Sequence, residues 1–116
     1  MGLRMFLNGK QGTLVPWFIG TRQVIRVLFT DDDGAPEDTD AATSLELLVY
    51  SDSNRTTLVT TITLAADTAK KGHATYTLTS AFATLAINTT YYLWGKIERT
   101  AGDVSISKVS STLSVS

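Results

Sequence analysis

The sequence contains no cysteine, a single histidine and two prolines among its 116 residues. Without cysteine the chain can form neither a disulfide framework nor a thiolate metal site, and it has no thiol nucleophile. General acid–base catalysis needs a second titratable group within hydrogen-bond reach of the first, and the sequence identifies no such partner for His73. The G-x-S-x-G turn of serine hydrolases is absent as well. We therefore predict that the protein is not an enzyme, that it has no catalytic residues, and that it carries no cofactor.

Long apolar runs and an excess of charge are also missing. No run of about 18 apolar residues is present, so we expect no transmembrane helix, and Met1–Lys10 is too briefly apolar for a secretion signal. The formal net charge of -1 provides no long-range attraction for nucleic acid or an acidic membrane. We expect a soluble chain made in a cytoplasm, with neither nucleic acid nor membrane as a partner.

The abundant residues are threonine and serine, which number 19 and 10 and alternate with apolar residues. This alternation is typical of strands with one buried and one half-wet face. It predicts strands over residues 22–30, 43–50, 57–64, 73–78, 90–99 and 104–115, with a bulge or bend near Ser107–Lys108 in the last one. The residues predicted to face the core are Ile25, Val27, Phe29, Leu45, Leu47, Val49, Leu58, Ile62, Leu64, Ala74, Tyr76, Leu78, Tyr91, Leu93, Ile97, Val104, Ile106, Val109, Leu113 and Val115.

Turn residues separate these strands. Asp31–Pro36 combines aspartate, glycine and proline, which together end a strand. Ser80–Ala86 differs, because a capping serine precedes Phe82 and Leu85 at helical spacing, which predicts one short helical turn. Short strands at roughly 10-residue spacing are typical of a β-sandwich. We predict an all-β antiparallel sandwich of about seven strands over residues 21–116.

The first twenty residues do not follow the pattern. Two apolar stretches flank a hairpin-like turn at Asn8–Gly12, and Pro16 argues against a central strand because it cannot donate to a ladder. Residues 1–20 are therefore interpreted as an N-terminal arm or edge hairpin that packs on another protein; an ordinary extra hairpin of the sandwich is the alternative. The apolar residues assigned to partner binding in this arm are Leu3, Met5, Phe6, Leu7, Trp17, Phe18 and Ile19.

Three further features remain open. Tyr92 and Trp94 are predicted to lie opposite the core set, where they would cover a second layer or bind a partner. Asp31, Asp33 and Asp38 leave a calcium site open, although the EF-hand spacing fails. The third feature is a set of four basic residues near the arm, which would either form a positive stripe that faces an acidic protein or be scattered charges that keep the protein soluble. These residues are Arg4, Lys10, Arg22 and Arg26.

A family pattern is visible between Val24 and Glu98. The acidic turn is followed by a strand at Leu45–Tyr50, a Gly-x-x-x-Tyr-x-Leu-Thr segment at Gly72–Thr79 and a tyrosine-rich strand at Tyr91–Ile97. This order resembles the N-terminal immunoglobulin-like domain of phage baseplate upper proteins and related virion domains. Asn88 and the two threonines after it depart from that pattern by replacing a usual glycine. We also expect no fibre or receptor-binding segment after residue 116, which would be a second departure.

The resemblance implies an immunoglobulin-like fold, a virion location and no catalytic residues. A short chain with one sandwich and an apolar arm is also similar to phage capsid decoration, or cement, proteins. We therefore expect a virion structural protein, made in the bacterial host cytoplasm, that binds the major capsid protein or other virion proteins as a homo-oligomer such as a trimer. The alternatives are a tail or baseplate adaptor or fibre base, and a carbohydrate-binding sandwich that uses Tyr92 and Trp94 as a stacking platform.

Overall fold

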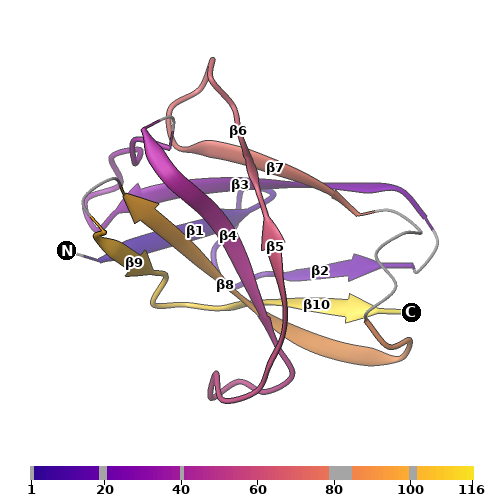
Figure 1. Ribbon diagram of the computed structural model, residues 1–116. Helices are drawn as coiled ribbons and strands as arrows, with labels where there is room; N and C mark the ends of the chain where they lie inside the picture. The colour runs from indigo at the N-terminus through magenta and orange to yellow at the C-terminus, as the bar shows by residue number, and fades with distance from the viewer. Residues whose placement is uncertain (1, 19–20, 40, 79–84, 100–101) are drawn as a thin grey trace.

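The computed structural model describes residues 2–18, 21–39, 41–78, 85–99 and 102–116, and these residues form a β-sandwich (Figure 1). Its strands are β1 (Leu3–Leu7), β2 (Leu14–Trp17), β3 (Gln23–Asp31), β4 (Ala42–Tyr50), β5 (Leu58–Thr63), β6 (Ala65–Ala66), β7 (His73–Leu78), β8 (Thr89–Arg99), β9 (Val104–Ile106) and β10 (Ser111–Val115). In the described ranges no helix is long and apolar enough to cross a membrane. The helical turn predicted at residues 80–86 falls mostly outside them.

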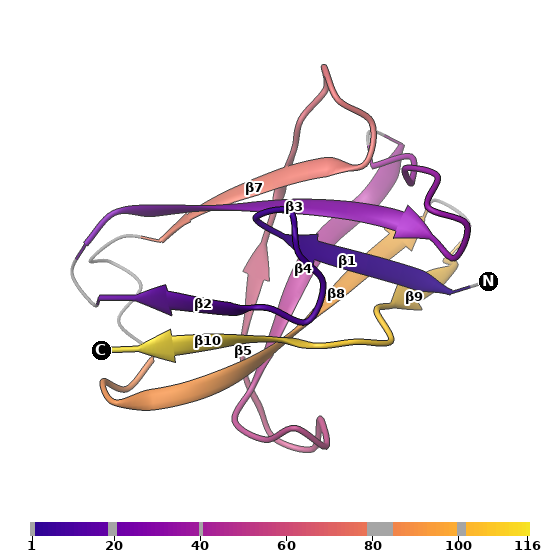
Figure 2. The same ribbon diagram turned by 180° about the vertical axis from the view of Figure 1, so that it is seen from behind.

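Two sheets make up the sandwich. The smaller sheet has the order β1-β3-β7-β6, and the larger has the order β2-β10-β8-β4-β5, with β9 also paired to β8. Seen from behind, β1 lies beside β3 while β2 lies beside β10 (Figure 2). The chain thus contributes its first strand to one sheet and its second strand to the other. The prediction of an all-β, immunoglobulin-like sandwich is confirmed, with one correction: β2 pairs with β10 in parallel rather than antiparallel.

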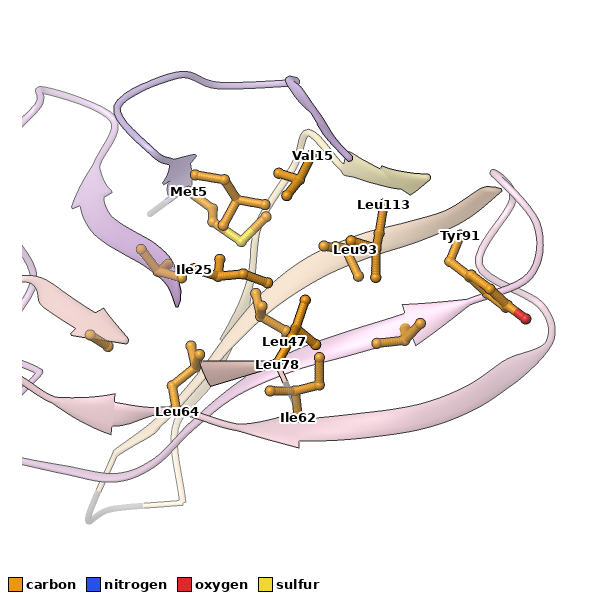
Figure 3. Packing of buried hydrophobic residues seen from close by; sticks show 14 of the residues in the cluster. Met5, Val15, Ile25, Leu47, Ile62, Leu64, Leu78, Tyr91, Leu93 and Leu113 are labelled. Carbon is orange, nitrogen blue, oxygen red and sulfur yellow. The ribbon is translucent and has the colours of Figure 1, made fainter. Parts of the chain in front are cut away.

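The core lies between the sheets (Figure 3). The alternation predicted from the sequence is confirmed for most strands, because inward residues such as Phe29, Leu47 and Leu93 are fully buried. Gly95 sets how closely the sheets approach. A Cβ atom at this position would lie 2.5 Å from the ring of Phe29 and 2.8 Å from the sulfur of Met5. A side chain here would therefore push the two sheets apart.

The arm interpretation of residues 1–20 is not supported by the packing. The side chains of Leu3, Met5, Leu7 and Trp17 are at most 1% exposed and belong to the protein's own core. They are core residues rather than a docking surface, because β1 pairs with β3 and β2 pairs with β10 along their lengths. The alternative of extra strands of the sandwich describes this segment better, and residue 20 does not separate an arm from a domain.

The turn after β1 explains how the chain changes sheets. Leu7 and Lys10 exchange both backbone hydrogen bonds, at 2.8 and 3.0 Å, around Asn8 and Gly9. Both turn residues have positive φ, 51° and 87°, as a type I′ hairpin turn requires. The hairpin-like turn is confirmed. The chain then leaves the first sheet and joins the second at its edge, where Pro16 needs no donor.

Two details of the strand predictions differ in outcome. The alternation predicts Leu58, Val104 and Val109 in the core, but they are 51%, 46% and 42% exposed. Val104 begins the short strand β9, which pairs with β8 alone among the described strands, and Val109 lies in the break between β9 and β10. A register shift between Val49 and Tyr50 turns the start of β5 over, so that Val59 packs on the core instead. The bend expected near Ser107–Lys108 is confirmed, since the last strand is interrupted between β9 and β10. There the backbone and hydroxyl of Ser107 both bond to Gly95.

Candidate functional site

The outer face of the larger sheet carries a row of side chains that crosses five strands. Strand register places its members directly opposite one another, and directly paired residues project on the same face. With a strand spacing of about 4.8 Å, the row spans roughly 19 Å. We call it the outer row, and its members in order are Leu14, Thr112, Tyr92, Tyr50 and Leu58.

The outer row is largely apolar and open to solvent. Leu14 and Leu58 at its two ends are 57% and 51% exposed, and the three residues between them are half-buried. Leucine side chains this exposed at the two ends of the row add little to the folding stability of the isolated chain, because their apolar surface stays in water. A largely apolar strip exposed on a sheet face is typical of a surface that contacts another molecule.

Trp94 lies next to this row but beneath other side chains. Its exposed fraction is 7%. The ring of Tyr50 meets it edge-on with centroids 5.5 Å apart, and the guanidinium of Arg55 lies 5.9 Å from the ring centre. Trp94 is therefore not the open stacking platform that the carbohydrate-binding alternative requires. It supports Tyr50, the member of the row between Tyr92 and Leu58.

The loop that carries Arg55 is held by one carboxylate. Asp52 accepts hydrogen bonds from the Thr56 hydroxyl at 2.6 Å and from the backbone N–H of Thr57 at 3.0 Å. These bonds, the Thr56 hydroxyl first, hold the pKa of Asp52 below its ordinary value. Arg55 itself adopts a positive φ of 57°, which turns the loop back over Trp94. The loop geometry thus fixes the cation over the ring.

An ion pair lies on the outer face of the larger sheet, between strands β4 and β8. Glu46 and Lys96 are register partners on β4 and β8, and their side chains form an ion pair of 3.4 Å. Because the two charges neutralise each other, this pair adds little net field at the neighbouring outer row. The Arg55 guanidinium over Trp94 is a positive charge beside the row, so the face is suited to a predominantly apolar contact with one cation at its side.

The remaining predicted partner residues are dispersed. Tyr92 lies at the centre of the outer row, as its parity predicted. Phe6 lies on the other sheet, opposite Leu28, and is half-buried. Phe18 follows β2 and is 65% exposed. Ile19 lies outside the described residues. The structure thus does not bring the predicted arm residues together on one surface.

Sequence reasoning missed Leu14, Tyr50, Leu58 and Thr112. The signal for Tyr50 was present, because it follows three inward residues of β4 in alternation and must point outward. The position of Leu58 depends on a bulge, and that of Leu14 depends on pairing with a strand almost one hundred residues away in the chain. Neither has a local signal.

The carboxylates of the acidic turn after β3 accept hydrogen bonds from backbone N–H groups. One carboxylate oxygen of Asp31 accepts from the N–H groups of Asp33 and Ala35 at 2.9 and 3.0 Å. Asp32 instead accepts from the N–H of Gly2 and lies 3.4 Å from the Lys108 ammonium. Across the described ranges, no three acidic or histidine side chains are grouped so as to hold a metal ion. The turn therefore offers no calcium site built from Asp31, Asp33 and Asp38.

No family model and no curated protein matches the chain. Among solved structures it is similar to CopC from Methylosinus trichosporium OB3b, with a TM-score of 0.50 and 14% identity over 96% of this chain and 94% of that one. It is also similar to superoxide reductase (neelaredoxin) from Ignicoccus hospitalis, with a TM-score of 0.51 and 9% identity over 100% and 81%.

A third match is the catalytic module of the glycogen-degrading pneumococcal virulence factor SpuA, with a TM-score of 0.46 and 21% identity. It covers 72% of this chain and 10% of that one. The likeness to CopC and neelaredoxin supports the immunoglobulin-like sandwich. At these identities it extends to the fold alone.

Proposed function

We propose that this chain is a non-catalytic structural protein of a phage virion, a capsid decoration protein that binds the assembled shell through the outer row. The observation that carries the proposal is the largely apolar outer row, which crosses five of the six strands of the larger sheet. The virion context comes from the sequence pattern between Val24 and Glu98. The binding surface differs from the arm expected from sequence.

The physical basis of binding is burial of the row against a matching strip on the major capsid protein. Each buried apolar Å² contributes about 25 cal/mol, before the cost of association. A few exposed leucines and tyrosines give a weak contact for one copy. Repetition over many shell sites, and self-association of the sandwich on the shell, would raise the total by avidity.

The test is co-sedimentation of the purified protein with expanded capsids that lack decoration. Leu14→Ser and Leu58→Ser remove apolar surface at the two ends of the row, and Tyr92→Ser removes it at the centre. All three residues lie on the surface side of the sheet, so the sandwich should remain folded. Ile87→Ser is the matched control, since it removes a side chain that is 54% exposed outside the row. We expect saturable binding that the row variants lose and the control keeps.

Two outcomes would contradict the proposal. Equal binding by the row variants and the control would remove the row as the docking surface. If no variant and no wild-type protein sedimented with shells, the capsid assignment would fail. Binding of the wild type to purified tails or baseplates would then favour a tail adaptor, the alternative left open by the sequence pattern.

A further inference from the structure

A groove of about 500 Å³ crosses the outer face of the smaller sheet, on the side of the sandwich away from the outer row. Its floor is β3, where Val24, Arg26 and Leu28 project outward in alternation. One wall is the turn at Asn8 and Gly9, and the other is formed by Lys70 and His73 before and at the start of β7. Figure 2 views this sheet, with β3 lying between β1 and β7.

The wall at Asn8 is fixed to the floor. Its backbone N–H donates to the carbonyl of Arg26 at 2.8 Å, and its side-chain oxygen accepts from the N–H of Arg26 at 3.1 Å. The second bond uses the oxygen of the Asn8 side-chain amide. The turn that shapes the wall is thus tied to β3 by two hydrogen bonds.

The groove has positive character without a balancing acid. Arg26 and Lys70 line it, and neither takes part in an ion pair with any residue in the described ranges. No aspartate or glutamate lines it. Asp67, the acidic residue nearest to Lys70 in the chain, accepts instead from the N–H of Ala69 at 3.0 Å. The cations are therefore free to meet a negative group from another molecule.

The spacing along the floor indicates the shape of that molecule. Outward residues of one strand lie about 6.7 Å apart, which gives the order apolar, cationic, apolar over Val24, Arg26 and Leu28. An extended peptide has the same two-residue repeat. We propose that this groove binds an extended acidic segment of a partner protein, with apolar side chains over Val24 and Leu28 and a carboxylate between Arg26 and Lys70. This site is independent of the outer row and of the shell assignment.

The test uses the full chain and a fluorescein-labelled decapeptide, Leu-Ser-Asp-Ser-Leu-Ser-Asp-Ser-Leu-Ser, whose leucines and aspartates alternate along one face of the extended chain. Binding is followed by fluorescence anisotropy at low ionic strength. Arg26→Ala and Lys70→Ala should each weaken binding about fivefold, as expected for one partly solvated ion pair. The matched controls are Arg22→Ala and Lys71→Ala, which remove the same charges from exposed residues that do not line the groove. Circular dichroism checks that every variant keeps its strands.

Binding that depends on the groove cations and not on the control cations supports the proposal. Equal weakening by all four substitutions would overturn it, because it would indicate a general charge effect. Absence of binding by the wild type would also overturn it. A sulfated polysaccharide that binds through Arg26 and Lys70 while the peptide does not would reassign the groove to a polyanion and refute the peptide.

Discussion

Trp17 and Phe18 are adjacent aromatic residues with opposite environments, and they allow a direct test of whether the first twenty residues are core or arm. Trp17 is 0% exposed, and its indole N–H donates to the carbonyl of Thr21 at 3.1 Å. Phe18 is 65% exposed. If the segment is part of the sandwich, Trp17→Ala should destabilise the protein strongly and Phe18→Ala should not.

The expected magnitude follows from burial. Truncating a fully buried tryptophan to alanine costs about 3–5 kcal/mol in lost contacts and cavity, whereas an exposed substitution changes stability by about 0.5 kcal/mol or less. A domain of this size loses roughly 4 °C of Tm per kcal/mol. Trp17→Ala should therefore lower Tm by about 12–20 °C. That loss is a large part of the net stability of about 5–15 kcal/mol typical of a domain.

Urea unfolding followed by far-ultraviolet circular dichroism measures both variants, and Trp94 remains as a fluorescent reporter when Trp17 is removed. Similar small losses for the two substitutions would refute the reasoning, because they would mean that Trp17 is not packed in the core. A Trp17→Ala protein of normal stability that no longer bound capsids would restore the arm interpretation.

Three further predictions concern packing, charge and an unpaired hydroxyl. Gly95→Ala should cost about 1–3 kcal/mol in urea unfolding, because the new methyl group would overlap the ring of Phe29; an unchanged midpoint would contradict the close approach of the sheets. Stability should fall as pH drops below about 4. The hydrogen bond from the Gly2 N–H lowers the folded-state pKa of Asp32, and the hydrogen bond from the Thr56 hydroxyl lowers that of Asp52. The stability that these two carboxylates contribute is therefore fully present above the unfolded pKa of 3.8 and is lost as pH falls through the lowered folded-state values. Urea midpoints measured against pH should show this loss, and the double substitution to asparagine should flatten it. Ser111→Ala should leave stability unchanged or raise it by up to about 1 kcal/mol in thermal unfolding, because the buried hydroxyl has no hydrogen-bond partner in the described ranges; a clear loss would indicate an unseen partner.

Local pattern was sufficient to predict most strands and most of the core. The alternation in β3, β4 and β8 depends on neighbours two residues apart, and burial of Ile25, Leu47 and Leu93 followed from it. The turn at Asp31–Pro36 was also readable, since its aspartate bonds to its own backbone. These features involve residues close together in the chain. The same is true of Tyr92, whose outward direction was set by parity alone.

The fate of the first strands was decided by tertiary structure. An apolar run such as Leu3–Leu7 is expected both in a core strand and in a docking arm, because its side chains are buried in either case. The two cases differ only in whether the run packs against its own chain or against another molecule. The pairing of β1 with β3 and of β2 with β10 shows that both strands pack within the sandwich, and these contacts join residues far apart in the sequence. The outer row arises in the same way, because five strands bring together single residues that carry no signal in isolation. Composition and alternation thus determined which segments are strands, whereas the pairing of distant strands determined which apolar side chains remained on the surface.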